Sequence, residues 1–192
     1  AGVELETTHS SNVVAEVRDG ISADKSVINL TGGATGSFTI EADNVTNFNH
    51  TGRIGNGGVL SGTGANIDHT VTANVTAEVG DYVDLDAKSI QMDAVNKIVK
   101  PSGTHFRGDQ GGVIDGTNVD SDIDIDLTTK TIIGDNSTLD VTGDKLAPGA
   151  FSLNALNDLE VYEKINLISG GLVAGAGAFV DIDLTTNIAA VE

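Results

Sequence analysis

The sequence predicts an all-β protein, a parallel β-solenoid with internal repeats of roughly 55 to 60 residues. The first observation is a segment that recurs: Gly170–Glu192 (GGLVAGAGAFVDIDLTTNIAAVE) has counterparts at Gly111–Ile133, at Gly57–Val79 and, without the glycine opening, at Gly2–Val17. The second is a strict alternation of apolar and polar residues inside these copies, which is typical of half-buried strands. The third is the spacing of short apolar segments by Gly, Asn and Asp turn signals. A sandwich or closed barrel would not explain the long repeat.

The repeats divide the chain into imperfect copies at approximately 1–56, 57–110, 111–169 and 170–192, within one solenoid segment spanning residues 1–192. In a parallel solenoid each coil stacks on its neighbour about 4.8 Å away and covers its open strand edges. We expect roughly 20 residues per coil, so that each copy supplies two or three coils. The glycine pairs then mark corners of the coils.

In chain order, the repeated segment of the first copy ends near Val17, and strands are predicted at 21–30 and 37–42. In the second copy, TVTANVTAEV (70–79) alternates strictly and predicts a strand. Ser89–Lys100 (SIQMDAVNKIVK) has loosely helical spacing, ended by Pro101, but a strand with a bulge is the alternative that we favour.

The third copy predicts a strand at 123–133, and short strands follow at 138–142, 150–156, 159–162 and 165–168. The last copy carries an alternating strand at its end. We predict that the equivalent strands 71–79, 123–133 and 180–188 lie next to one another in one stacked sheet.

Composition and charge exclude several classes of partner. The formal net charge is -18, with 28 acidic residues against 10 Lys plus Arg, so the chain lacks the basic surface that nucleic acids and anionic membranes require. No apolar stretch of about 18 residues predicts a membrane span. The absence of cysteine rules out a disulfide framework. The expected partners are copies of the chain itself, surface glycans, and host or neighbouring cells.

The residues GGLVAGAGAFVDIDLTTN (170–187), preceded by IIGDNSTLDVTG (132–143), resemble the repeat units of the large leukotoxin-like filamentous adhesins of Gram-negative bacteria. That resemblance implies a right-handed parallel β-helix rod that is exported to the cell surface or the medium. It also implies adhesion or matrix formation as the role, with no catalytic residues. The match covers most of 111–192 well and the first half loosely, and Ser89–Arg107 departs from it, which allows a lateral excursion there.

Alternate aspartates form the most chemically distinctive pattern of the chain. Those of the third copy share one face of their predicted strand, and two more repeat the pattern in the last copy. If the coils stack in register, like charges come to lie near 4.8 Å apart. Either water and salt screen them, or calcium ions bridge them through oxygen ligands. The candidate calcium ligands are Asp120, Asp122, Asp124, Asp126, Asp181 and Asp183.

The histidines do not predict a zinc site, because they are isolated in the sequence and the chain has no cysteine. They are His9, His50, His69 and His105.

The function that the sequence favours is structural: an extracellular filament segment that forms a rod, or polymerises head to tail, as a surface fibre or matrix component. The first alternative is a carbohydrate-active β-helix enzyme, which would need acid and base carboxylates, or a base with cationic groups, in a cleft. With arginine only at 18, 53 and 107 and no tryptophan, we do not expect an enzyme. The second alternative is an ice- or surface-binding solenoid, which would need a regular threonine grid around Thr70, Thr72 and Thr128.

Overall fold

The computed structural model describes residues 2–31, 36–103, 106–143 and 148–190. The described part of the chain is made of strands, with no helix, and so none that could cross a membrane. The strands are β1 (Gly2–Val17), β2 (Ser26–Asn29), β3 (Ser37–Asn47), β4 (Gly52–Val79), β5 (Val83–Ala87), β6 (Ser89–Lys100), β7 (Phe106–Ile133), β8 (Thr138–Val141), β9 (Ala150–Val161), β10 (Ile165–Gly170) and β11 (Val173–Ala189). The predicted all-β class is confirmed.

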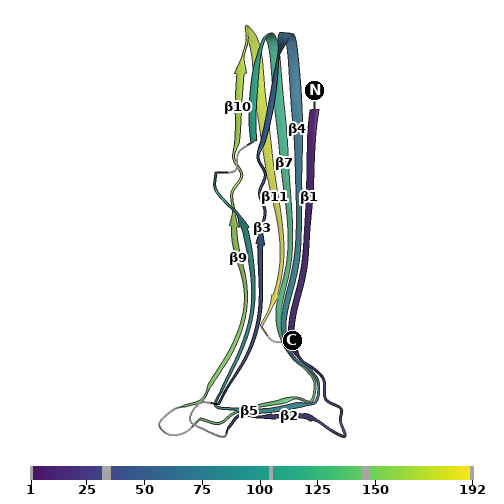
Figure 1. Ribbon diagram of the computed structural model, residues 1–192, viewed down its shortest axis with the longest axis vertical. Coiled ribbons are helices and arrows are strands. Elements are labelled where there is room, and N and C mark those ends of the chain that lie inside the picture. Colours follow the sequence, from purple (N-terminus) through teal and green to yellow (C-terminus); the bar gives the residue numbers. More distant parts are fainter. Residues whose placement is uncertain (1, 32–35, 104–105, 144–147, 191–192) are drawn as a thin grey trace.

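The strands form three sheets, and every strand pair is parallel. The long sheet has the order β1-β4-β7, with both β10 and β11 on the far side of β7. The short sheet is β2-β5-β8 and the return sheet is β3-β6-β9. The chain visits the long, short and return sheets in turn before it enters the long sheet again (Figure 1). This arrangement is compatible with a β-helix or β-solenoid.

One repeat makes one coil, so the expectation of about 20 residues per coil is wrong. Successive coils are offset by 62 residues from Gly2 to Gly64, by 54 from Gly52 to Phe106 and by 59 from Ile114 to Val173. The reason lies in the glycine pairs at 57–58 and 111–112, which bend β4 and β7 without ending them, whereas the pair at 170–171 separates β10 from β11. β4 and β7 rise, turn over at the upper end and run down again, and β10 and β11 follow the same path (Figure 1).

The predicted stacking of the three alternating strands is confirmed. Val71 pairs with Ile125 and Val79 with Ile133, while Val180 pairs with Ser121 and Ile188 with Thr129. Ser89–Lys100 is a strand, as we favoured, but it has no bulge, and it is neither a helix nor a lateral excursion. It is β6, the central strand of the return sheet, in unbroken register with β3 and β9. Its inward positions are apolar except for Asn96 and Lys100, and the period of two decides its structure.

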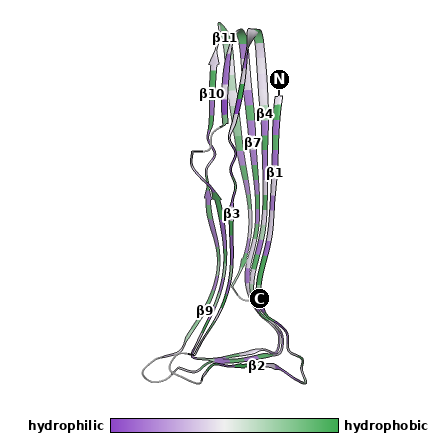
Figure 2. Cartoon of the chain, in the orientation of Figure 1, coloured by the Kyte–Doolittle hydropathy of each residue, from purple (hydrophilic) through white to green (hydrophobic). Residues whose placement is uncertain are grey.

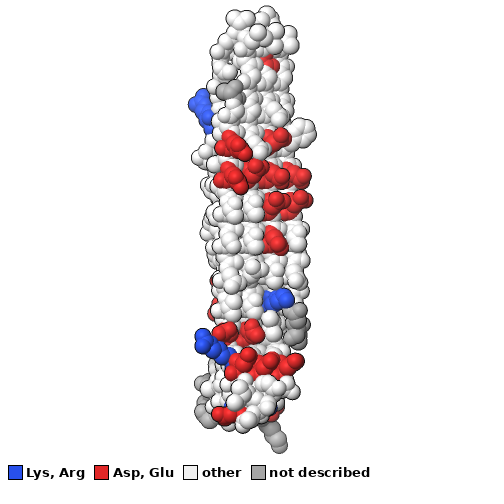
Figure 3. Space-filling model, turned by 90° about the vertical axis from the view of Figure 1, so that its right-hand side faces the viewer, with Lys and Arg blue, Asp and Glu red and all other residues white. Residues whose placement is uncertain are grey.

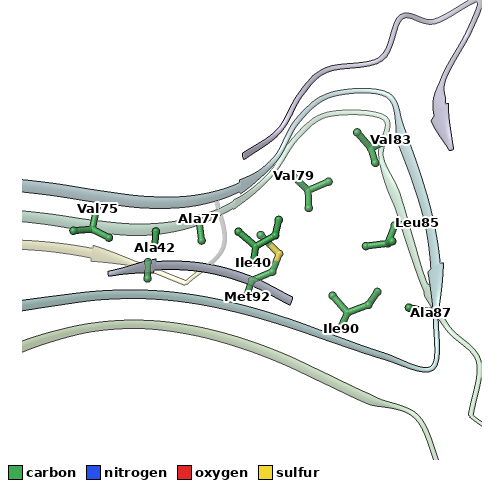
Figure 4. Packing of buried hydrophobic residues seen from close by; sticks show 11 residues of the cluster. Ile40, Ala42, Val75, Ala77, Val79, Val83, Leu85, Ala87, Ile90 and Met92 are labelled. Atoms are coloured by element: carbon green, nitrogen blue, oxygen red, sulfur yellow. The ribbon is translucent and has the colours of Figure 1, made fainter. Parts of the chain in front are cut away.

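The core lies between the sheets and is built from small and β-branched side chains. Alternate residues of each strand point inward, which gives the banded hydropathy of Figure 2. At the lower corner, Val75, Ala77 and Val79 of β4 face Ile40 and Met92 of the return sheet, with the short sheet closing the side (Figure 4). Within the return sheet an asparagine ladder runs through the core, where the Nδ2 of Asn44 donates to the Oδ1 of Asn96 at 2.8 Å.

The glycine pairs permit the close approach of successive coils at the upper bend. A Cβ on Gly112 would lie 2.5 Å from the carbonyl oxygen of Gly58, and one on Gly171 would lie 2.5 Å from that of Gly112. Neither position therefore accepts a side chain without a shift of backbone. The prediction that these glycines mark corners agrees with this geometry.

Candidate functional site

The predicted aspartates lie where the alternation places them, exposed on the outer face of the long sheet. Asp181 pairs with Asp122, and Asp183 pairs with Asp124. The ladder extends further than the sequence-based set, because Asp68 pairs with Asp122 on its other side and Glu6 pairs with Asp68. Four carboxylates therefore follow one another across four neighbouring strands. Figure 3 shows this acidic face as rows of red residues.

The crowding of like charges has an electrostatic consequence at the centre of the ladder. Partial burial, followed by the neighbouring charges of Asp124 and Asp181, raises the pKa of Asp122. Among the described residues no group of three or more His, Cys, Asp or Glu side chains has the arrangement of a metal site. Calcium bridging by the six candidate aspartates stays a prediction, and the ions would have to bind between rungs at the surface.

A buried chain of polar groups crosses the coils below the upper bend, and the sequence did not predict it. The Nε2 of His69 lies 2.6 Å from the Nδ1 of His50, and the Nδ1 of His69 contacts the hydroxyl of Thr7. On its other side, the Nε2 of His50 lies 3.3 Å from the Oε1 of Glu163. The Oε2 of Glu163 contacts the Nζ of Lys100, which also donates to the carbonyl of Tyr162 at 2.9 Å.

These groups are almost completely enclosed. The side chains of Lys100 and Glu163 are 0% and 1% exposed, which makes theirs a fully buried ion pair. Burial alone would raise the pKa of Glu163, but the contacts with His50 and Lys100 outweigh it and lower that pKa. Burial, followed by electrostatic interaction with His50 and with Lys100, lowers the pKa of His69 to about 4. At neutral pH the core thus holds a neutral His69 beside an ionised Glu163.

The aromatic ring of Phe48 completes this cluster. Its centroid lies 5.3 Å from that of His69 and 6.0 Å from that of His9, while the rings of His50 and His69 stack at 4.8 Å. Three of the four histidines therefore gather around one phenylalanine, although they are far apart in the sequence. The fourth, His105, lies outside the described residues. His9 is only partly buried and lines a surface hollow, but the side chains of His50, His69, Lys100 and Glu163 are closed to solvent. The chemistry of these buried groups is that of a structural polar network.

A second buried polar group lies beneath the upper bend. The amide of Gln110, with its nitrogen turned toward Asp115, contacts that carboxylate and accepts from Thr63 and Thr117. Asp115 also accepts hydrogen bonds from Ser61 at 3.0 Å and from Ser169 at 2.8 Å. These residues come from three neighbouring rungs of the long sheet. They fill the space between its rising and descending parts with hydrogen-bonded side chains.

The threonine grid that an ice-binding surface would need is interrupted. Thr70 pairs with Asp124, and Thr72 pairs with Asp126, so carboxylates share those ladders. The hollows on the described surface are open and are lined by glycine backbone, asparagine, threonine and aspartate. Comparisons with protein-family models, with curated proteins and with solved structures find no match for this chain.

Proposed function

We propose that the protein is a right-handed β-solenoid segment of an extracellular filament, whose coils stack into a surface fibre or matrix. Parallel strands joined by crossovers are right-handed in nearly all proteins, which supports the handedness. The proposal assigns no catalytic role to any residue. The resemblance of 132–143 and 170–187 to filamentous adhesin repeats supports export, adhesion, and contact with glycans or neighbouring cells.

One observation carries the filament proposal: the end of the stack is as apolar as its interior. Ile182 and Leu184 of β11 are 43% and 52% exposed, whereas Ile123 and Ile125, with which they pair on β7, are 0% and 2% exposed. A further coil stacked on β11 would bury these side chains and would form hydrogen bonds with the free edge of β11. At the opposite end β1 presents an open edge of the same long sheet.

Either the same polypeptide or a second copy of the chain can supply that further coil. Stacking of separate copies is the alternative that can be tested with the 192-residue chain alone. It is a heterologous contact that does not close, so it produces fibres instead of rings. In such a fibre the strands run across the fibre axis and the rungs repeat every 4.8 Å or so.

The test uses a double variant, Ile182→Lys with Leu184→Lys, beside a matched control, Thr185→Lys. Inward-pointing lysines on an edge strand block strand addition, but at half-exposed positions they still reach water in the single chain. Thr185 is exposed on the same strand and its side chain points outward, because it follows Leu184 directly. We expect the wild-type chain and the control to form fibres in electron micrographs, and the double variant to stay unassembled with its circular dichroism unchanged.

Fibre diffraction of the wild-type assemblies should show a meridional reflection from the rung spacing. Absence of any assembly by the wild-type chain would contradict copy-to-copy stacking. Fibres formed equally well by the Ile182→Lys, Leu184→Lys chain would show that β11 is not the joining edge.

A further inference from the structure

The upper bend carries an exposed apolar surface that the fold itself does not require. We call this surface the tip, and it consists of the two residues that follow each glycine pair. They are 44% to 88% exposed: Val59, Leu60, Val113, Ile114, Leu172 and Val173. Leu60 pairs with Ile114, and Ile114 pairs with Val173, so the tip is continuous across three rungs.

The polarity of the chain is inverted at this place. In most of the other strand segments apolar residues point inward and polar residues outward, apart from the asparagine ladder and the buried chain of polar groups around His69. Beneath the tip, however, the enclosed residues are Gln110, Asp115 and Thr117, at 7%, 5% and 5% exposed. Directly beneath the tip, hydrogen bonds join the two sides of the bend. Apolar contacts between the two sides resume one layer further down, where Ile54 and Phe106 pack with Ile67 and Val119. The apolar residues of the tip add nothing to the core, so their burial has to come from outside the coil.

The tip is also the part of the surface without exposed charge. The rungs 54–67 and 165–180 contain no charged residue, and the third rung contributes only the buried Asp115 between 110 and 119. Below the tip, Asp109 is neutralised by Arg53 at 2.6 Å and Arg107 at 2.7 Å. Figure 3 shows one small acidic patch near the upper end, and the rows of acidic residues begin below it. In a chain of net charge -18, this end is where a second copy can approach with least repulsion.

We infer that two copies of the chain bind each other tip to tip through a two-fold axis. The axis that reverses the stacking direction places the first rung of one copy opposite the last rung of the other. Val59 then faces Leu172 of the partner subunit, and Leu60 faces Val173 of the partner subunit, so a larger side chain meets a smaller one at these two contacts. The middle rung, with Ile114, faces its own copy across the axis. Such an interface is isologous and closes after two subunits.

The size of the tip fits a dimer. Its six side chains expose an apolar patch on the order of 600 Å², at the upper limit of what a monomer leaves uncovered. Burial of both patches removes about 1,200 Å² from water, which is the lower end of specific protein interfaces. In the proposed fibre this contact would join two stacks side by side. It does not depend on the fibre, however, because it uses a different face from the stack ends.

The test relies on the absence of native cysteine, so that introduced thiols report only on the chosen position. It is made in the Ile182→Lys, Leu184→Lys background, which removes end-to-end stacking. Ile114→Cys should form a disulfide-linked dimer under mild oxidation, and so should an equal mixture of Leu60→Cys and Val173→Cys chains. Asn12→Cys, exposed on the far part of the long sheet, is the control and should stay monomeric.

Sedimentation velocity tests the interface without a covalent link. The chain should be a dimer whose dissociation is unaffected by salt, and Leu60→Asp with Leu172→Asp should lower its affinity by at least a hundredfold. Because both side chains point to solvent in the single chain, the melting temperature of the monomer should not change. A monomer at all concentrations, or crosslinking of Ile114→Cys no faster than that of Asn12→Cys, would overturn the inference. So would a chain that stays monomeric but binds neutral lipid vesicles through the tip.

Discussion

The repeat pattern of the sequence did not predict the buried cluster of His50, His69, Lys100 and Glu163. Nothing in their sequence neighbourhood distinguishes them, and the histidines were expected to be isolated. They meet because His69 lies on the descending part of the long sheet while His50 and Glu163 lie where the return sheet passes into it. Such contacts join different coils, so they depend on the coil length, which the sequence-based estimate placed too low.

The depressed pKa of His69 predicts a defined loss of stability in acid. An exposed histidine in the unfolded chain titrates near pH 6.5, whereas His69 titrates at about 4 in the folded protein. The unfolded state therefore binds more protons between these values, and the free energy of unfolding falls as the pH decreases from 6.5 to 4. The charged and titratable groups that face His69 and influence its pKa are His50, Lys100, Glu163 and His9. We expect a loss on the order of 2 kcal/mol across this window.

Urea titrations at pH 7, 5.5 and 4 measure this loss, with His69→Gln as the comparison. Glutamine keeps a polar contact to its neighbours but does not titrate. The variant is expected to be less stable at pH 7 and to show a shallower fall toward pH 4. An equal slope in both proteins would assign the acid sensitivity to other groups.

At the scale of the strands, the period of two was the most reliable feature of the sequence. It placed the inward and outward residues of β4, β7 and β11 correctly, and it put the six aspartates on one face. It also resolves β6, whose loose helical spacing was outweighed by pairing with β3 and β9 on both sides. The sheet to which a strand belongs could not be predicted, because it depends on whether a glycine pair bends the chain or ends the strand.

The bend itself leads to a prediction about Gly112. An alanine Cβ at this position would meet the carbonyl oxygen of Gly58 at 2.5 Å and the hydroxyl of Ser61 at 2.9 Å. We expect Gly112→Ala to lower the free energy of unfolding by about 1–3 kcal/mol, as overpacking does. Gly116→Ala is the matched control, because a Cβ there meets nothing within 4 Å. Equal stability of the two variants in denaturant titrations would show that the stacking distance at the bend adapts freely.

At the scale of the whole molecule, the long axis follows the strands and not the stack (Figures 1 and 3). Strands of 28 residues make each coil wide, and only four strands lie side by side in most of the long sheet. Repetition in the sequence predicted that equivalent segments would stack, and they do. The repetition could not predict that the molecule is longer along its strands than along its stack. The number of residues per coil depends on both limbs of each bent strand, and the bend was not predicted. The tip and the buried polar groups beneath it were not predicted for the same reason.

The acidic face leads to a prediction about salt. Asp122 lies at the centre of the carboxylate ladder, so Asp122→Asn should stabilise the protein by about 0.5–1 kcal/mol at low ionic strength and by less at high ionic strength. Glu160→Gln, an exposed change on β9 outside the ladder, is the control and should have little effect.

Thermal unfolding in sodium chloride and in calcium chloride of equal ionic strength separates screening of the carboxylates from their bridging by calcium. A calcium effect that exceeds that of sodium, and that disappears in Asp122→Asn, would support calcium ligands in this face; equal effects would leave screening alone.

The parallel register of the long sheet has a mechanical consequence. Within each limb of the long sheet neighbouring strands point the same way, although the rising and descending limbs run in opposite directions, and β4 pairs with β7 along both limbs (Figure 1). Tension applied along the strands would load the hydrogen bonds between two neighbouring strands of one limb together in shear. Rupture would then require many bonds to fail together instead of one after another. A tether built in this way resists pulling along its length far better than peeling from its side.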